Sequence, residues 1–442
     1  MINKINNPEH LSLTRQHKEA VALLSIGTIL EYFDLCLYVH MAVLLNNLFF
    51  PKMDPYTATL ISSFSFCSTF IFRPLGALIF GWIGDHIGRK PTVTITTTMM
   101  ALSCGIMAIL PTYDQIGITA SFAITICRII QGLSSMGEMV GAELYLTELI
   151  KPPLRYPIVC LMPIAAALGA IMALGIATII FVLKLEWRFA FVIGSIIALV
   201  GTVARTALRE TPEFADAKRR LQKKYEKINM KQGKVLKEDI IFNEPVNQKT
   251  SLAYFFIRAS GPVWLYFSYI YCADILKHSF NYSPQEIIQH NLIIAIIECL
   301  TTLFLACLSY KIHPLKIINS RIIIFSIFII LIPYLFSNIT KVIHLFFIQI
   351  FICFFKPSTT PAAAVFFTYF PIFKRFTYVS VLYALSHALV YIITSFGLVY
   401  LTKIFNNWGL LIIFIPTFIG FKFGISHFDK LEKESQLRYT NN

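Results

Sequence analysis

The stretch Gly81-Trp82-Ile83-Gly84-Asp85-His86-Ile87-Gly88-Arg89-Lys90 joins two long apolar segments of the chain. Gly81 lets two helices approach closely, and Gly88 permits a tight turn, because neither carries a side chain. Asp85 can pair with the positive end of a neighbouring helix or with a basic partner. Arg89 and Lys90 favour the inner side of a membrane, where they can clamp helix C-termini. The stretch therefore predicts a charged inner gate between packed helices.

The composition of the chain speaks against a soluble enzyme. Of its 442 residues, 56% are hydrophobic and only 14% are charged, and the mean hydropathy is +0.66. A soluble globular chain is roughly a quarter charged, and a single hydrophobic core stops growing at about 250–300 residues. So much apolar sequence requires surrounding lipid. The nine Cys residues lie in apolar runs without any CxxC pair, so we interpret them as small buried hydrophobes.

Apolar windows of about 20 residues predict twelve membrane-spanning helices. They cover residues 20–46, 57–83, 92–111, 116–147, 157–183, 188–208, 251–277, 286–309, 319–337, 342–365, 376–401 and 408–426. The predicted organisation is an N-terminal six-helix bundle (1–208), a cytoplasmic central loop (209–250) and a C-terminal six-helix bundle with a short cytoplasmic tail (251–442). The fold class is an all-α polytopic membrane protein made of two six-helix bundles.

The net charge of +14 indicates orientation in a membrane rather than nucleic-acid binding. The segments predicted to lie inside carry many more Lys and Arg residues than the outer segments, so both termini are predicted to be cytoplasmic. The central loop begins Arg209-Glu210-Thr211-Pro212-Glu213-Phe214. Its basic continuation favours a short amphipathic helix on anionic lipid at the inner leaflet, with a solvated linker as the alternative.

Charged residues inside the predicted spans are candidate functional residues, because a charge at the bilayer centre is costly unless it faces a partner or a cavity. On span one, Glu31, Asp34 and Tyr38 lie within about 60° of one helix face. Two close carboxylates do not easily ionise together, which suits a proton carrier or a cation-binding floor. The alternative is a permanent ion pair between one of these acids and Arg73 or Arg128.

Span four contains Arg128-Ile-Ile-Gln131-Gly132-Leu-Ser-Ser-Met136-Gly137-Glu138. Arg128 should meet an acid in the interior of the bundle, and Glu138 follows on the same helix. Secondary candidates for a cavity are Arg73, Arg258, Lys356 and Trp264. Lys356 precedes Pro357, where a broken helix can expose carbonyl groups. The aromatic residues around Trp264 can form a cage for a quaternary ammonium or can simply pack.

Signatures of enzymes and of ATP-driven pumps are missing from the sequence. It contains no Walker A motif, no dinucleotide-binding glycine motif after a strand, no nucleophile elbow and no metal-binding cluster. The sequence therefore predicts neither an enzyme nor a protein that uses ATP, and it predicts no cofactor.

Several motifs together resemble one branch of a known family. They are Glu31-Tyr-Phe-Asp34, Arg73-Pro74-Leu75-Gly76, the 81–90 stretch, Arg128-x-x-Gln131-Gly132, Gly137-Glu138-x-x-Gly141-Ala142-Glu143, Glu186-Trp187-Arg188-Phe189, Arg209-Glu210-Thr211-Pro212-Glu213-Phe214 and Phe370-Pro371-x-x-x-Arg375. The chain is similar to the metabolite:proton symporters of the major facilitator superfamily, which include proline/betaine, α-ketoglutarate, shikimate and citrate carriers. This resemblance implies two six-helix halves that rock about a substrate and a proton bound between them.

The chain departs from the family pattern at three places. His86 replaces the usual Arg or Lys, Met136 replaces a Gly, and the second copy of the loop signature is degenerate at Leu308-Ser309-Tyr310-Lys311-Ile312-His313. The tail is too short for a coiled coil of three heptads, so osmotic gating through such a tail is not implied.

The sequence and the resemblance together predict a monomeric, proton-coupled importer in a bacterial inner membrane. Its expected partners are membrane lipid and a small-molecule substrate, first a proline- or betaine-like zwitterion. A dicarboxylate such as α-ketoglutarate, held by Arg128 with Arg258 or Lys356, is the runner-up. A membrane sensor that keeps the fold without transport is a further alternative.

Overall fold

The structure, a computed structural model, describes residues 13–51, 55–183, 185–206, 208–220, 222 and 245–441. Every regular element within these ranges is helical. The first half consists of α1 (Arg15–Phe49), α2 (Pro55–His86), α3 (Arg89–Ile109), α4 (Tyr113–Ile116), α5 (Ile118–Leu149), α6 (Arg155–Val159), α7 (Leu161–Val182) and α8 (Arg188–Thr206). Residues 212–220, in the predicted central loop, are also helical.

The second half begins at Gln248. It consists of α11 (Gln248–Tyr266), the π-helix η2 (Phe267–Tyr271), α12 (Cys272–Phe280), α13 (Pro284–Lys311), α14 (Pro314–Ser337), α15 (Val342–Phe355), α16 (Ala363–Phe367), α17 (Arg375–Phe405), the 3₁₀ turn η3 (Asn406–Trp408) and α18 (Gly409–Asn441). Most of the predicted central loop lies outside the described residues, so its limits stay a prediction.

Local sequence signals explain where helices begin and end. Between α12 and α13, Asn281 takes a left-handed conformation with φ of 54°, which asparagine tolerates better than most residues. Ser283 then caps α13, and the side chain of Glu286 returns a hydrogen bond to the backbone of Ser283. Pro284 occupies the first helical position, where its missing N–H costs nothing. A reversal of the chain between two long helices is thus specified by four residues.

Eight of the described helical segments are long and apolar enough to cross a membrane, and α8 and α15 contribute shorter apolar segments. The long helix α2 and the continuous rod of α11, η2 and α12 bring the described long helices to twelve. The prediction of an all-α polytopic fold is therefore confirmed. One predicted span is too long: residues 342–365 form a helix only as far as Phe355. Pro357 disfavours a helical conformation at the residue before it, and Lys356 accordingly has an extended ψ of 143°.

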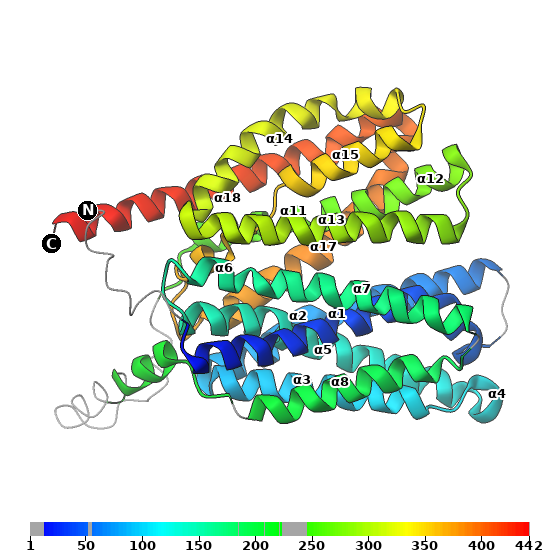
Figure 1. Cartoon of the computed structure of the whole chain (residues 1–442), viewed down its shortest axis with the longest axis horizontal. Coiled ribbons are helices and arrows are strands. Elements are labelled where there is room, and N and C mark those ends of the chain that lie inside the picture. Colours follow the sequence, from blue (N-terminus) through cyan, green and yellow to red (C-terminus); the bar gives the residue numbers. More distant parts are fainter. Residues whose placement is uncertain are drawn as a thin grey trace.

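The two halves lie side by side, and the start of α1 lies at the same end of the molecule as the end of α18 (Figure 1). Helix α17 packs against α2 of the first half and against α11 and α18 of its own half, and α7 packs against α13. These seams fix how residues of the two halves meet.

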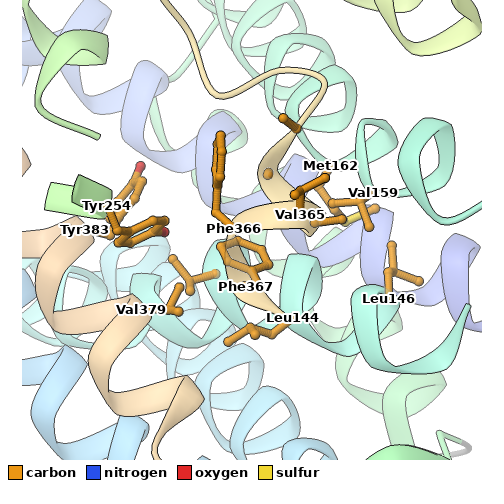
Figure 2. Close-up of a cluster of buried hydrophobic side chains, with 14 of the residues drawn as sticks. Leu144, Leu146, Val159, Met162, Tyr254, Val365, Phe366, Phe367, Val379 and Tyr383 are labelled. Carbon is orange, nitrogen blue, oxygen red and sulfur yellow. The ribbon is translucent and has the colours of Figure 1, made fainter. Parts of the chain in front are cut away.

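A buried hydrophobic cluster joins the halves towards the predicted cytoplasmic end (Figure 2). The first half contributes Leu144, Leu146 and Val159, and the second half contributes Phe366 and Phe367. All five side chains are buried. Because apolar burial is favourable by about 25 cal/mol per Å², this cluster holds the halves together at that end.

Candidate functional site

An acidic residue of the first half caps a helix of the second half. Asp85, near the end of α2, accepts hydrogen bonds from the backbone N–H groups of Phe376 (2.9 Å) and Thr377 (2.8 Å). These N–H groups lie in the first turn of α17, where a helix has no internal acceptors for them and where its dipole favours an anion. Asp85 also pairs with Arg89 at 2.9 Å. The residue therefore has both kinds of partner that its sequence context suggests.

Arg89 lies at the centre of this site and is fully buried. Its guanidinium donates to both carboxylate oxygens of Glu148 on α5 and to the carbonyl oxygen of Ile372 in the second half. It also lies over the ring of Phe214, at 4.7 Å. A buried arginine with this many acceptors has the geometry of a structural clamp, because its charge is compensated on every side.

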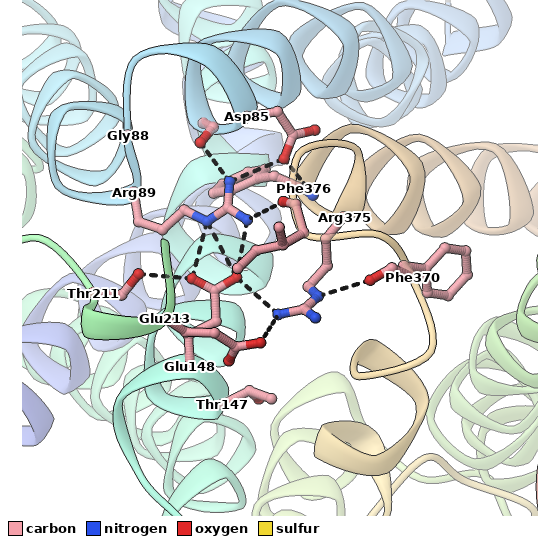
Figure 3. Close-up of polar contacts among 12 residues, drawn as sticks. Asp85, Gly88, Arg89, Thr147, Glu148, Thr211, Glu213, Phe370, Arg375 and Phe376 are labelled. Carbon is pink, nitrogen blue, oxygen red and sulfur yellow. Dashed lines mark hydrogen bonds and ion pairs between the residues drawn. The ribbon is translucent and has the colours of Figure 1, made fainter. Parts of the chain in front are cut away.

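Glu148 extends the network into the second half (Figure 3). Its Oε1 pairs with Arg375 of α17 at 3.1 Å, and the hydroxyl of Thr211 donates to its Oε2 at 2.8 Å. Arg375 pairs in turn with Glu213 at 3.0 Å. We call Asp85, Arg89, Glu148, Glu213 and Arg375 the inner clamp. It connects α2, α3, α5, α17 and the segment that follows α8.

Glu210 caps α3, whose first residue, Arg89, belongs to the inner clamp. Its carboxylate accepts the backbone N–H groups of Arg89 (3.0 Å) and Lys90 (3.3 Å), the first residues of α3. Gly88, just before them, has φ of 152°, and an added Cβ there would collide with the carboxylate of Glu210. Gly81 lies against the backbone of Thr377, where α2 crosses α17. Both positions thus require glycine, because a neighbouring residue lies too close to leave room for a Cβ atom.

The degenerate second copy of the loop signature is compensated by other residues. His313 lies 3.6 Å from Glu432, and the hydroxyl of Tyr369 donates to Glu432 at 2.6 Å. The ring of His313 also contacts Tyr156 of the first half, edge to face, with 5.8 Å between centroids. In the first copy, His86 stacks on Trp82.

The two acids of α1 have separate partners. Glu31 pairs with Arg73 of α2 at 3.6 Å, and Asp34 pairs with Arg128 of α5 at 3.5 Å. Arg128 also donates to Gln131 at 2.8 Å. The alternative of an ion pair with Arg73 or Arg128 therefore fits the structure, and it applies to both acids. Their role as proton carriers stays a prediction. The side chains of Tyr38 and Glu138 lie outside those that the structure describes.

Two further ion pairs involve the secondary candidates. Arg258 of α11 pairs with Glu143 of α5 at 2.9 Å, across the two halves. Lys356 pairs with Glu298 of α13 within the second half. Trp264 lies elsewhere: it is fully buried among Phe267, Phe325 and Phe414, in the core of the second half. Its indole packs between helices of the second half, which fits the packing alternative better than a cage.

The geometry resembles that of a known fold. The family model of the Major Facilitator Superfamily matches residues 23–371. The chain belongs to the Major Facilitator Superfamily. A structure of the proton:xylose symporter XylE bound to 6-bromo-6-deoxy-D-glucose has a TM-score of 0.75 over 94% of this chain and 95% of its own, at 14% identity. That likeness shows the fold.

Two curated relatives add more detail to the major facilitator assignment. The proline/betaine transporter of Escherichia coli K12 is 32% identical over 204 residues, which is 45% of this chain and 41% of that protein. The glycine betaine/proline/ectoine/pipecolic acid transporter OusA of Dickeya dadantii is 27% identical over 278 residues, or 61% of this chain and 54% of that protein. The matches thus span about half the length of these relatives. Because the family consists of transporters, the expectation that the chain is not an enzyme is confirmed.

The sequence reasoning did not single out every residue of this major facilitator's charged core. Glu143 and Glu148 each neutralise a buried arginine, Glu298 neutralises the partly exposed Lys356, and Arg375 completes the inner clamp. A sequence signal did exist for them: all are charges within or beside apolar runs, and each such charge needs a partner. What the sequence lacks is the pairing, since the partners lie on helices far apart in the chain.

Proposed function

We propose that this chain is a proton-coupled importer of a small polar metabolite, of the proline/betaine-type zwitterion class. It acts as a monomer among the lipids of a bacterial inner membrane, with both termini in the cytoplasm. The names of the two curated relatives support the substrate class. The Lys and Arg distribution supports the orientation.

The carboxylates of α1 are the proposed proton sites. The pairs of Glu31 with Arg73 and of Asp34 with Arg128 span 3.6 and 3.5 Å, whereas the pairs of the inner clamp span 2.9 to 3.1 Å. A longer ion pair forms weaker hydrogen bonds and is easier to separate. A proton on Asp34 would release Arg128, and loss of the proton would restore the pair.

The inner clamp supports an alternating-access cycle. In the described state the halves are joined at the predicted cytoplasmic end by the clamp and by the apolar cluster around Phe366. Import requires these contacts to open after substrate and proton have bound. The ion pairs that cross the seam between the halves can form and break together when the halves rock.

The pairing of the four candidate cations favours a zwitterion over a dicarboxylate. Arg73, Arg128, Arg258 and Lys356 each lie beside an acid. A dicarboxylate adds two negative charges and would have to displace two acids from two cations. A zwitterion adds no net charge, so it disturbs the balance of buried charge least.

Uptake into proteoliposomes tests the proposal. Purified protein is reconstituted, and a proton gradient, acid outside, is imposed with a panel of radiolabelled proline, betaine, α-ketoglutarate, citrate and shikimate. We expect accumulation of proline or betaine that collapses with a protonophore. Accumulation of α-ketoglutarate alone would mean that the substrate is a dicarboxylate and not a zwitterion. A folded protein that accumulates none of the five would refute transport of this class and favour a sensor.

A further inference from the structure

The π-helix η2 (Phe267–Tyr271) interrupts the rod formed by α11 and α12. Side chains from other helices bind its backbone: Gln349 donates to the carbonyl oxygen of Ser268 at 2.7 Å, and Asn291 donates to that of Tyr269 at 3.4 Å. A π-helical turn is rare and is found frequently at functional sites. Here it directs the side chain of Tyr269 towards a charged pair.

That pair consists of Glu298 and Lys356. The hydroxyl of Tyr269 donates to Glu298 Oε2 at 2.8 Å, and Lys356 Nζ lies against Glu298 Oε1. Glu298 is near the middle of α13, and Lys356 follows the last residue of α15. Arg321 of α14 holds the broken backbone in place by donating to the carbonyl oxygen of Lys356 at 2.9 Å. Three helices thus converge on one ammonium and one carboxylate.

The exposure of this pair distinguishes it from the arginine pairs. The side chains of Lys356 and Glu298 are 14% and 29% exposed. In the pairs of Arg73, Arg128 and Arg258, every side chain is at most 5% exposed. The lysine pair is therefore the one among these four that a small solute can approach without first opening packed side chains.

The pair also lies on the side of the second half that meets the first. Tyr269 is within electrostatic range of Cys36 on α1, and Cys36 is within range of Asp34. A solute at Lys356 and Glu298 would therefore lie close to the proposed proton site. Two buried polar atoms of the same region, Ser268 Oγ and Asn291 Oδ1, have no hydrogen-bond partner among the described residues, which suits polar groups of a ligand.

We infer that Lys356, Glu298 and Tyr269 form the binding site for the charged groups of a zwitterionic substrate. The carboxylate of the substrate binds the ammonium of Lys356, and its cationic nitrogen binds the carboxylate of Glu298 beside the Tyr269 ring. This inference rests on the proposed function and deepens it by assigning the substrate to named residues.

The physical reason is the complementarity between an ion pair and a zwitterion. When the solute inserts, one protein pair is exchanged for two protein–solute pairs, so no charge is left uncompensated. A solute with one charge would strand either Lys356 or Glu298 in a region of low dielectric constant. The site therefore selects for a solute that carries both charges. A lysine suits such a site better than an arginine, because its ammonium can change partners more easily than a guanidinium that binds a carboxylate through two hydrogen bonds.

Charge-neutralising variants of the two residues test this inference. We expect Lys356→Gln and Glu298→Gln each to raise the KM for the transported zwitterion by roughly 10–100-fold, the range of one charge-assisted hydrogen bond. Lys433→Gln is the matched control, since Lys433 pairs with Asp429 on the exposed surface of α18 and should leave KM unchanged. Binding of radiolabelled proline or betaine to the purified protein, measured without a gradient, should be weaker in both variants and unchanged in Lys433→Gln.

The outcomes separate this inference from the proposed function. If the wild-type protein accumulates no substrate, the proposed function fails. If the wild-type protein accumulates substrate and both variants keep its KM, only this inference fails. Loss of binding in Lys356→Gln with full binding in Glu298→Gln would mean that the site takes an anion rather than a zwitterion.

A second measurement covers the case in which the variants do not fold. In the wild-type protein, saturating proline or betaine should slow the labelling of the half-buried Cys36 by a permeant methanethiosulfonate and leave the exposed Cys307 unaffected. Equal labelling of Cys36 with and without a transported zwitterion would overturn the assignment, because Cys36 is within electrostatic range of Tyr269 in the site.

Discussion

Glu143 of α5 and Arg258 of α11 form an ion pair of 2.9 Å that connects the two halves of the protein. Both side chains are almost fully buried. Arg258 is also held by the hydroxyl of Tyr254 at 2.8 Å, and its guanidinium lies over the ring of Tyr383 at 4.9 Å. The pair is therefore a central contact of the described state, with the apolar cluster around Phe367 beside it.

Neutralising one partner of this pair should destabilise the protein strongly. We expect Glu143→Gln to lower the free energy of unfolding by about 3–5 kcal/mol, because it leaves a buried guanidinium without its counter-charge. The double change Glu143→Gln with Arg258→Gln should recover much of that loss. Thermal unfolding of the purified variants measures both effects. Additive losses in the double variant would contradict the pairing.

The cap that Asp85 provides for α17 should control opening at the predicted cytoplasmic end. Asp85→Asn removes the anion from the first turn of α17, an effect worth about 0.3–2 kcal/mol, and weakens the hold on Arg89. Cys160 is a native reporter, because it is buried and its thiol faces the carbonyl oxygen of Pro361 across the seam. We expect Asp85→Asn to increase the rate of maleimide labelling at Cys160 by up to roughly 30-fold.

A matched control separates opening from a general loss of charge. Asp114 lies exposed in α4, near the opposite end of the bundle, so Asp114→Asn should leave Cys160 as protected as in the wild-type protein. Labelling is quantified by mass spectrometry of each cysteine peptide, with the exposed Cys307 as internal reference. Unchanged protection of Cys160 in Asp85→Asn would show that the cap does not hold this end closed.

Much of the fold is predictable from local sequence. Apolar length alone places twelve helices, because the bilayer sets a minimum span. The end of α15 at Phe355 is an exception: the apolar window runs on to residue 365, although Pro357 disfavours the α conformation at Lys356. The role of Asp85 as a helix cap follows from an acid next to glycines at a helix end. The helix limits depend on residues that are neighbours in the chain, whereas α17, the helix that Asp85 caps, begins far from it in the sequence.

The pairing of charges in the core is not predictable in the same way. On α1, the sequence places Glu31 and Asp34 on one face but does not say that Arg73 binds the first and Arg128 the second. Glu298 and Tyr269 meet only because the π-helix shifts the phase of the rod beyond Tyr266. A regular α-helix, with 100° per residue, lacks the extra residue of a π-helical turn. The sequence pattern therefore does not predict the contact between Glu298 and Tyr269.

Asp34 should be required for coupling and not for movement of the halves. In Asp34→Asn, the neutral amide mimics the protonated acid, so we expect gradient-driven accumulation to be lost while exchange between equal substrate pools is partly kept. Uphill uptake and exchange are measured in the same proteoliposome preparation. The control is Asp114→Asn, which should retain both activities.

The structural alternative for Asp34 makes a different prediction. If the carboxylate only neutralises Arg128, Asp34→Asn should lower expression and stability, and adding Arg128→Gln should restore them, since an unpaired buried charge is removed. Normal uphill uptake by a well-expressed Asp34→Asn protein would exclude Asp34 as the proton carrier. Glu31, with its own pair to Arg73, is then the next residue to test.

The crossing of α2 and α17 should depend on the absence of a side chain at Gly81. A methyl group at Gly81 would lie 2.6 Å from Cα of Thr377, which is backbone and cannot move aside alone. We expect Gly81→Ala to cost about 1–3 kcal/mol, as overpacking does, and to expose Cys160. Gly175→Ala on α7 is the matched control, because nothing lies within 4 Å of its added Cβ and alanine has the higher helix propensity. Thermal unfolding and cysteine labelling of both variants provide the comparison. Equal stability and equal protection of Cys160 would mean that α2 can move away from α17 at no cost, and the close crossing would then not hold the halves.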